Sequence, residues 1–257
     1  MPSEVRHEVI GGQTYPVVRL VGLLDAATAP TVRARLLDLL AGQPEALVVD
    51  VRELTVGRPA ATAVLGEVAR EAADWPGGDL LLSTGSGAPA WRDTGLPVWP
   101  DPEDAFAALG PPEPWRFLRA PLEPVVGAAR RSRELVTEAC ARWDLPDLAG
   151  PACIVVTEMV NNVVAHAHTP MTVLLALRGD RMSVAVRDHS TYVPRFTGGP
   201  VPVTSYGGRG LLLINSVAQL WGSLALDDGK VVWALLDADG ADADQLPSTG
   251  MAGRARG

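Results

Sequence analysis

The stretch from residue 156 to residue 166 carries three polar residues whose types and spacing suit chemistry on a phosphorylated ligand. Glu158, Asn162 and His166 lie four residues apart, and the residues between them are mostly apolar. In a helix, this spacing places the three side chains on one face, each about one turn above the last. A carboxylate and an amide on a largely buried helix cost free energy unless they find polar partners. Phosphates with a divalent ion and a polarised water would be such partners.

A strand that ends in an acid and a glycine-rich helix start follow later in the chain. Residues 184–188 (VAVRD) predict the strand, which ends at Asp188, and residues 207–211 (GGRGL) open an apolar helix. Glycines before a helix let the backbone approach an anion, and the free N–H groups and dipole of the helix start favour negative charge. The loop between the two motifs is rich in proline and glycine. We expect it to act as a lid over phosphates.

The order of these motifs is similar to that of the Bergerat-type (GHKL, histidine-kinase-like) ATP fold. The similarity covers residues 115–236 and includes the Trp-Gly pair at 221–222 and the Gly-Lys-x-x-Trp sequence at 229–233. Within this fold, the chain most resembles the anti-sigma-factor serine kinases. The resemblance implies an α/β sandwich, in which helices cover one face of a mixed sheet. It also implies ATP and Mg2+ as cofactors.

The resemblance assigns roles to individual residues. Asn162 would coordinate the Mg2+ ion that bridges the phosphates, since an amide oxygen suits this hard cation. Glu158 would orient or deprotonate the attacking hydroxyl, or polarise a water. Asp188 would accept the exocyclic amine of adenine. Ser190 stands where the family usually has glycine, so the floor of the adenine pocket is expected to differ there.

The glycine-rich helix start would supply the phosphate contacts. By the same resemblance, these come from the backbone of Gly208, Gly210 and Leu211. Arg209 could contact a phosphate or equally the partner protein. His166 matches a position that is often histidine in the family, and we expect it to pack behind the site rather than to bind a ligand.

In the first half of the chain, predicted strands alternate with predicted helices. The strands are expected at residues 15–25, 46–51 and 79–83. The helices are expected after Thr28, the predicted N-cap, and over about residues 60–72. This alternation predicts a small parallel or mixed sheet with helices packed over it.

Residues 14–110 resemble the STAS domain, on which anti-sigma-factor antagonists are built. The resemblance rests mainly on residues 21–30 (VGLLDAATAP) and 47–50 (LVVD). Phosphorylatable antagonists open the next helix with a serine or threonine. The matching stretch here, residues 56–61 (VGRPAA), has no hydroxyl, and Thr55 and Thr62 lie outside that register. This half is therefore expected to be a non-phosphorylated partner or sensor domain.

The remaining segments connect and complete the two domains. Residues 101–104 (DPED) predict a capped helix start, with acids in the first turn of a helix that ends at residue 109. The prolines of residues 111–114 predict a short, stiff linker. Trp91 and Trp99 fit core edges better than a ligand cage. Residues 237–257 predict a disordered tail.

The second domain, residues 115–236, is expected to begin with a strand and a long helix over residues 124–143. Arg130, Arg131 and Arg133 on this helix fit a solvated face better than a phosphate contact. The other expected elements are a hairpin over residues 171–186, a helix over 211–220 and a closing hairpin over about 221–235.

Composition limits the class of protein. At 257 residues with 47% hydrophobic residues, the chain has room for two domains with buried cores. Its net charge of -8 argues against direct binding to nucleic acid, which favours a basic face. No apolar run approaches the roughly 20 residues of a membrane span, and the N-terminus has no apolar signal core. Cys140 and Cys153 form neither a metal pair nor a disulfide framework. We therefore expect a cytoplasmic protein without a membrane partner.

Two functions of different classes fit these observations. In the first, the chain is a serine/threonine protein kinase that phosphorylates a separate STAS antagonist and sequesters a sigma factor, in partner-switching control of transcription. The Glu158–Asn162 pair favours this function. In the second, the chain is an ATP-gated binding module without turnover, whose STAS-like half is a built-in partner or sensor. The missing phospho-acceptor favours that alternative.

Two further expectations concern signalling class and assembly. A sensor histidine kinase is disfavoured, because no helix pair with a phospho-acceptor histidine precedes the ATP domain. The family that the chain resembles commonly dimerises through the ATP domain. A homodimer is therefore an open alternative to a monomer.

Overall fold

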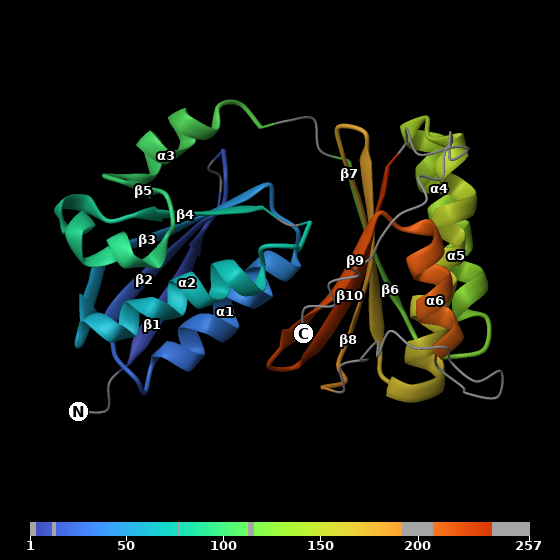
Figure 1. Ribbon diagram of the computed structural model, residues 1–257, viewed down its shortest axis with the longest axis horizontal. Coiled ribbons are helices and arrows are strands. Elements are labelled where there is room, and N and C mark those ends of the chain that lie inside the picture. Colours follow the sequence, from blue (N-terminus) through green and yellow to red (C-terminus); the bar gives the residue numbers. More distant parts are fainter. Residues whose placement is uncertain (1–3, 12–13, 77, 113–115, 192–207, 238–257) are drawn as a thin grey trace, which may run out of the picture. The chain divides into compact units, whose positions relative to one another are not determined.

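Two five-stranded sheets organise the chain, one in each of two compact units, Met1–Glu113 and Pro114–Gly257. The computed structural model describes residues 4–11, 14–76, 78–112, 116–191 and 208–237 (Figure 1). The expected lid over the phosphates and the expected tail therefore lie almost wholly outside the described residues.

The first sheet has the strand order β1-β2-β3-β4-β5. Its strands are β1 (Val5–Ile10), β2 (Val17–Leu24), β3 (Ala46–Val56), β4 (Asp79–Ser83) and β5 (Val98–Trp99). β1 pairs with β2 in antiparallel fashion, and the other three pairings are parallel. The predicted parallel or mixed sheet is confirmed. β1 was not predicted, because its residues are exposed or only half-buried and show no apolar alternation that would indicate a strand.

Helices cover both faces of the first sheet. They are α1 (Ala29–Ala41), the 3-10 turn η1 (Pro59–Thr62), α2 (Ala63–Glu71), the 3-10 segment η2 (Gly85–Thr94) and α3 (Pro102–Leu109). Figure 1 shows α1 and α2 on one side of the sheet and α3 on the other. Tyr15 packs its ring against Phe106 of α3, with the ring centroids 5.9 Å apart.

The two predicted helix caps have different outcomes. Asp101 caps α3 as expected, since its Oδ1 accepts a hydrogen bond from the Asp104 N–H at 2.9 Å. Thr28 lies at the N-cap position of α1, as predicted, but its hydroxyl donates to the Leu23 carbonyl oxygen at 2.8 Å and makes no capping bond. Asp25 orders this turn instead, and its Oδ1 accepts hydrogen bonds from two backbone N–H groups.

The second sheet has the strand order β6-β7-β8-β10-β9. Its strands are β6 (Arg116–Leu122), β7 (Met171–Arg178), β8 (Arg181–Asp188), β9 (Leu220–Leu226) and β10 (Gly229–Asp237). All four pairings are antiparallel, so the expectation of a mixed sheet in this unit needs correction. The second strand of the closing hairpin, β10, lies between β8 and β9. Because β10 runs antiparallel to both neighbours, no parallel pair forms.

Helices cover the second sheet on one face, as the fold class predicts (Figure 1). They are α4 (Ala128–Trp143), the 3-10 turn η3 (Pro146–Leu148), α5 (Ala149–Asn162), the π-turn η4 (Val163–Ala167) and α6 (Gly208–Val217). α4 starts four residues later than expected, after Gly127 at φ 101°. α5 packs against α4 and α6 and lies over β8 and β10.

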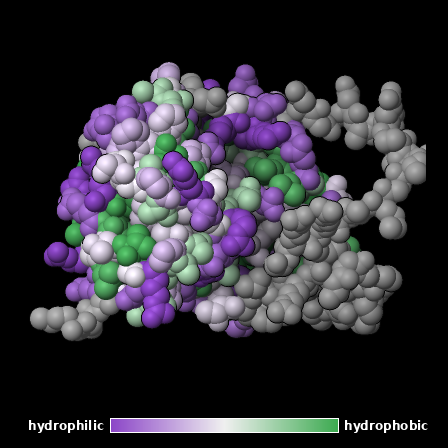
Figure 2. All heavy atoms as spheres, turned by 60° about the vertical axis from the view of Figure 1, so that its left-hand side comes forward, coloured by the Kyte–Doolittle hydropathy of each residue, from purple (hydrophilic) through white to green (hydrophobic). Residues whose placement is uncertain are grey.

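One core joins these helices to the sheet. The helix-facing side chains alternate along each strand, for example Met182, Val184 and Val186 of β8 and Val232 and Ala234 of β10. Large apolar side chains also remain on the surface, and Figure 2 shows hydrophilic and hydrophobic residues interspersed on one face of the molecule.

One stretch of described residues, Pro146–Ala167, is long and apolar enough to cross a membrane by length and composition. This corrects the expectation that no apolar run approaches such a length. The stretch consists of η3, α5 and η4, and the apolar residues of α5 lie in the core of the second unit. Core helices of globular domains meet the same criterion.

Candidate functional site

α5 positions two of the predicted site residues. Its buried side chains are Ala152, Val155, Val156, Met159 and Val160. Glu158 and Asn162, one helical turn apart, are half-buried at the edge of this packed surface. The four-residue spacing therefore places Glu158 and Asn162 on one face of the helix, as predicted.

His166 does not continue the same face. The α-helix ends at Asn162, and the His168 N–H donates to the Val163 carbonyl oxygen at 2.8 Å, a hydrogen bond that spans five residues. A π-turn is wider than an α-turn, so four residues no longer complete one turn. His166 is exposed in this turn. The expectation that His166 stacks above Asn162 and packs behind the site is wrong.

The start of α6 lies directly on Glu158. A Cβ atom added to Gly210 would lie 2.6 Å from Glu158 Oε2 and 3.5 Å from Glu158 Cβ, so only a glycine fits without displacing the carboxylate. Leu211, the next residue, is buried in the core and anchors the helix. The predicted glycine-rich helix start and the predicted acid are thus neighbours, although 52 positions separate Glu158 and Gly210 in the sequence. Gly208 and Arg209 form the first turn of α6, and their side-chain positions lie outside the described structure.

Asp188 is the last residue of β8 and is 2% exposed. Its carboxylate forms an ion pair with Lys230, whose Nζ lies 2.9 Å from both Oδ1 and Oδ2. The Ser190 N–H donates to Asp188 Oδ1 at 2.7 Å, and Lys230 Nζ also donates to the Ser190 carbonyl oxygen at 3.2 Å. The three residues form one hydrogen-bonded cluster.

This cluster lies at one end of the helix-covered face of the sheet. Asp188 continues the inward-facing residues of β8, and its partner across the ladder on the other side, Met171, belongs to the core. Gly229 makes room for it, because a Cβ atom at this position would lie 2.0 Å from the Asp188 carbonyl oxygen. The strand-end aspartate therefore faces the same layer as α5 and α6.

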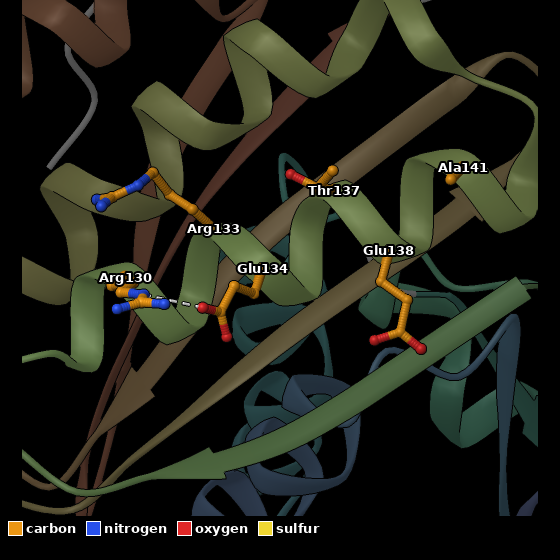
Figure 3. A pocket seen from close by; sticks show the side chains of 6 residues that line it. All are labelled: Arg130, Arg133, Glu134, Thr137, Glu138 and Ala141. Atoms are coloured by element: carbon orange, nitrogen blue, oxygen red, sulfur yellow. Dashed lines mark hydrogen bonds and ion pairs between the residues drawn. The ribbon is translucent and has the colours of Figure 1, made fainter.

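A separate shallow depression lies on the exposed face of α4. Figure 3 shows the six side chains that line it: Arg130, Arg133, Glu134, Thr137, Glu138 and Ala141. Hydrogen bonds from Arg131 and Arg130 lower the pKa of Glu134. These exposed pairs agree with the predicted solvated face and not with a phosphate contact.

The residues present fit an adenine nucleotide with a magnesium ion. Gly210 has no side chain in the narrow space beside Glu158, Asp188 supplies a buried carboxylate, and Asn162 supplies an amide oxygen of the kind that Mg2+ accepts. Within the described ranges, no group of three or more His, Cys, Asp or Glu side chains could hold a metal ion. A magnesium ion held chiefly by phosphates needs no such group.

Sequence reasoning missed Lys230 as a site residue. The Gly-Lys-x-x-Trp motif contributes to the resemblance to the ATP fold, but nothing in the sequence around it indicates that its lysine lies opposite Asp188. The aromatic end of the same motif has a structural role, since Trp233 lies across from Gly222 and leaves no room for a Cβ there.

Comparisons with known proteins match the second unit to a family of ATPase domains. The model of the histidine kinase-like ATPase domain matches residues 122–235. An uncharacterized protein of Streptomyces coelicolor, SCO4941, is 37% identical over 79 residues, which are 30% of this chain and 75% of the relative.

Two solved structures are also similar to the chain. A crystal structure of an anti-sigma factor antagonist from Mycobacterium paratuberculosis is 22% identical, with 42% of this chain and 96% of that chain covered and a TM-score of 0.35. The RsbU and RsbW domains of Rv1364c from Mycobacterium tuberculosis are 18% identical, with 48% of this chain and 32% of that chain covered and a TM-score of 0.37. Through its second unit, the chain belongs to the histidine kinase-like ATPase family.

Proposed function

We propose that the second unit binds ATP with Mg2+ and transfers the γ-phosphoryl group to a serine or threonine of a separate STAS antagonist protein. The carrying observation is the contact between Glu158 and the backbone of Gly210, which brings a carboxylate to the glycine-rich start of α6. In this proposal, transfer controls whether a sigma factor is bound, and the protein acts in the cytoplasm.

The transfer balances with Glu158 as the proton acceptor. The hydroxyl oxygen of the substrate forms a bond to the γ-phosphorus, and the bond from the γ-phosphorus to the bridging oxygen of ADP breaks. The hydroxyl proton moves to the Glu158 carboxylate, and ADP leaves with the electron pair of the broken bond. When bound, Mg2+ would neutralise charge on the phosphate oxygens.

Asn162 and the start of α6 would bind and orient the phosphates. Asn162 lies one turn beyond Glu158 on the same helix, so its amide oxygen can hold the metal while Glu158 faces the reacting group. The backbone N–H groups of Gly208, Gly210 and Leu211 would hold phosphate oxygens, since the first N–H groups of a helix have no intrahelical partner. Asp188 would accept the amino group of adenine.

The first unit offers no accessible hydroxyl at the position where STAS antagonists are phosphorylated. Residues 56–61 contain neither serine nor threonine. Thr62 follows them, but it is 5% exposed, and its hydroxyl donates to the Pro59 carbonyl oxygen at 2.8 Å. We therefore propose that the phosphoryl acceptor belongs to a separate protein.

The same observation favours a second candidate. An ATP-gated binding module without turnover would bind nucleotide in the same site, and its first unit would be a permanent partner or sensor that needs no hydroxyl. The two candidates differ in one measurable event, the appearance of label on protein.

Transfer from γ-labelled ATP with magnesium separates them. Wild type is incubated alone and with candidate STAS antagonists, beside Glu158→Gln, which removes the charge but keeps the shape. Glu138→Gln is the matched control, because Glu138 is a helical glutamate exposed on α4 and paired with Arg142. Label on an antagonist that disappears only in Glu158→Gln supports the kinase. ATP binding without label on any antagonist refutes the kinase and supports the module.

A binding measurement tests the base assignment for both candidates. Asp188→Asn, followed by calorimetry, is expected to weaken ATP binding by at least about tenfold, since a hydrogen bond to a charged group is lost. Unchanged affinity in this variant would refute the adenine role of Asp188.

A further inference from the structure

Lys230 lies directly opposite Asp188 in the antiparallel ladder of β8 and β10. Directly opposed residues share one face of a sheet. Both side chains therefore face the helix-covered side, where they are 6% and 2% exposed, respectively. The cluster thus stands in the layer where the proposed nucleotide would lie, and not on the outer surface.

Almost every hydrogen-bond donor and acceptor in the cluster of Asp188, Ser190 and Lys230 has a partner. The ammonium group of Lys230 has three N–H donors, and it has three acceptors within reach: Asp188 Oδ1 and Oδ2 at 2.9 Å and the Ser190 carbonyl oxygen at 3.2 Å. Asp188 Oδ1 also accepts from the Ser190 N–H at 2.7 Å. Among the residues that the structure describes, Oδ2 accepts from Lys230 alone.

We infer that Lys230 is a specificity-determining residue that makes this cluster select adenine over guanine; the inference rests on the proposed ATP binding. Lys230 and the Ser190 N–H occupy both lone pairs of Oδ1, and Lys230 occupies one of the two on Oδ2. The carboxylate therefore offers a base one acceptor position, on Oδ2. The 6-amino group of adenine needs one acceptor. Guanine presents two adjacent donors, N1–H and the 2-amino group, and a carboxylate binds both only when both of its oxygens are open.

The N–H donors of Lys230 disfavour guanine in a second way, because they are already hydrogen-bonded within the cluster. Recognition of the guanine O6 atom needs a donor, and the three donors of Lys230 already have acceptors. Lys230 therefore acts on the base through Asp188. It is a positioning residue that holds the carboxylate in one orientation and fixes which oxygen is available.

Lys230→Met tests this role, because methionine keeps much of the length of the side chain and removes its donors. The affinities of wild type and variant for ATP, GTP, ADP and GDP are measured by calorimetry with magnesium. We expect wild type to prefer adenine nucleotides. In Lys230→Met, ATP affinity is expected to fall on the order of tenfold to a hundredfold, with a smaller change for GTP. The ATP/GTP ratio is the diagnostic readout, since a merely structural loss would weaken both nucleotides alike.

Arg181→Met is the matched control. Arg181 forms an ion pair with Asp237 at 3.4 Å between the same two strands, at the other end of the ladder. Its loss removes a cation from the same strand pair but touches neither Asp188 nor its neighbours, so the ATP/GTP ratio is expected to equal that of wild type.

Lys230→Arg keeps the test decisive if the methionine variant does not fold. Arginine preserves the ion pair but brings five donors to three acceptors, which leaves donors for the guanine O6 atom. The ATP/GTP ratio is expected to fall because GTP binding improves. A wild-type ratio in every folded Lys230 variant would overturn the inference while leaving ATP binding intact. A wild-type protein that binds no adenine nucleotide would instead refute the proposed function itself, and the inference with it.

Discussion

Replacing Gly210 with alanine perturbs the contact between α6 and Glu158 and leaves the rest of the fold untouched. The added Cβ would lie 2.6 Å from Glu158 Oε2, closer than a carbon and an oxygen can approach without bonding. The obstructing atom is the end of a flexible side chain, whereas Glu158 Cβ, at 3.5 Å, is in ordinary contact. The carboxylate must therefore turn away while the helices stay in place.

The expected effect on stability is small because two contributions oppose each other. An off-rotamer glutamate costs about 0.5–1.5 kcal/mol. Replacement of a helical glycine by alanine stabilises a helix by about 1 kcal/mol. The free energy of unfolding is therefore expected to change by less than about 1 kcal/mol in either direction.

The expected effect on the site is large. A displacement of a reacting group by about 1 Å can slow a reaction by about a hundredfold. Gly210→Ala is therefore expected to lower phosphoryl transfer by about two orders of magnitude. It is also expected to weaken ATP binding, because the added methyl group and the displaced carboxylate take up space beside the helix start where the phosphates would lie.

Gly150→Ala is the control for this prediction. Gly150 lies in the first turn of α5, and a Cβ added there meets no atom within 4 Å. This variant is expected to keep wild-type binding and transfer. Urea unfolding and calorimetry with ATP are measured for both variants. Wild-type ATP binding and transfer in Gly210→Ala would refute the reasoning, as would a loss of several kcal/mol of stability.

Three further predictions follow from other contacts. Gly222→Ala places a Cβ 2.8 Å from the rigid ring of Trp233, so we expect a loss of about 1–3 kcal/mol in urea unfolding; an unchanged midpoint would contradict this. Burial would raise the pKa of Asp50, but hydrogen bonds from its arginine neighbours outweigh burial and lower that pKa. The ionised Asp50 therefore stabilises the fold at pH values above its ordinary pKa of 3.8, and this stabilisation is lost as the pH falls through the lower pKa of the folded state. Asp50→Asn should therefore flatten the acid limb of the stability profile, and a limb identical to that of wild type would count against it. Burial, followed by the nearby Cys153, raises the pKa of the Cys140 thiol to about 11, so alkylation at neutral pH should label Cys153 first, and equal labelling in the folded protein would refute that order.

Sequence analysis predicted the features that are determined by residues close together in the sequence. β4 has the predicted bounds, because three consecutive leucines at residues 80–82 lie between turn signals. The cap of α3 follows from the order of acids around Pro102, and the pairing of Glu158 with Asn162 follows from the geometry of one helix. Each of these features depends on neighbours within a few residues.

The features that sequence analysis missed depend on contacts between distant residues or on weak local signals. β1 carries no buried pattern, since it lies at the edge of the sheet, beside β2. η2 contains Pro89 and two glycines, which obscure its helical character. His166 was misplaced because a π-turn cannot be distinguished from an α-turn by residue spacing. The antiparallel order of the second sheet depends on where the last hairpin inserts, which no local pattern records.

That same insertion produces the most informative part of the candidate site. If β9 lay beside β8, the two strands would run parallel, and the residue opposite Asp188 would come from a different strand. Because β10 lies there instead, Lys230 pairs with Asp188, and Gly229 gives the Asp188 carbonyl group the room it needs. Loss of the lysine alone would leave a buried, uncompensated carboxylate, which costs about 3–5 kcal/mol, whereas loss of both charges is often nearly neutral. In the proposed site, the stability of the second unit and the choice of base would therefore both depend on this one pairing, which the sheet order produces.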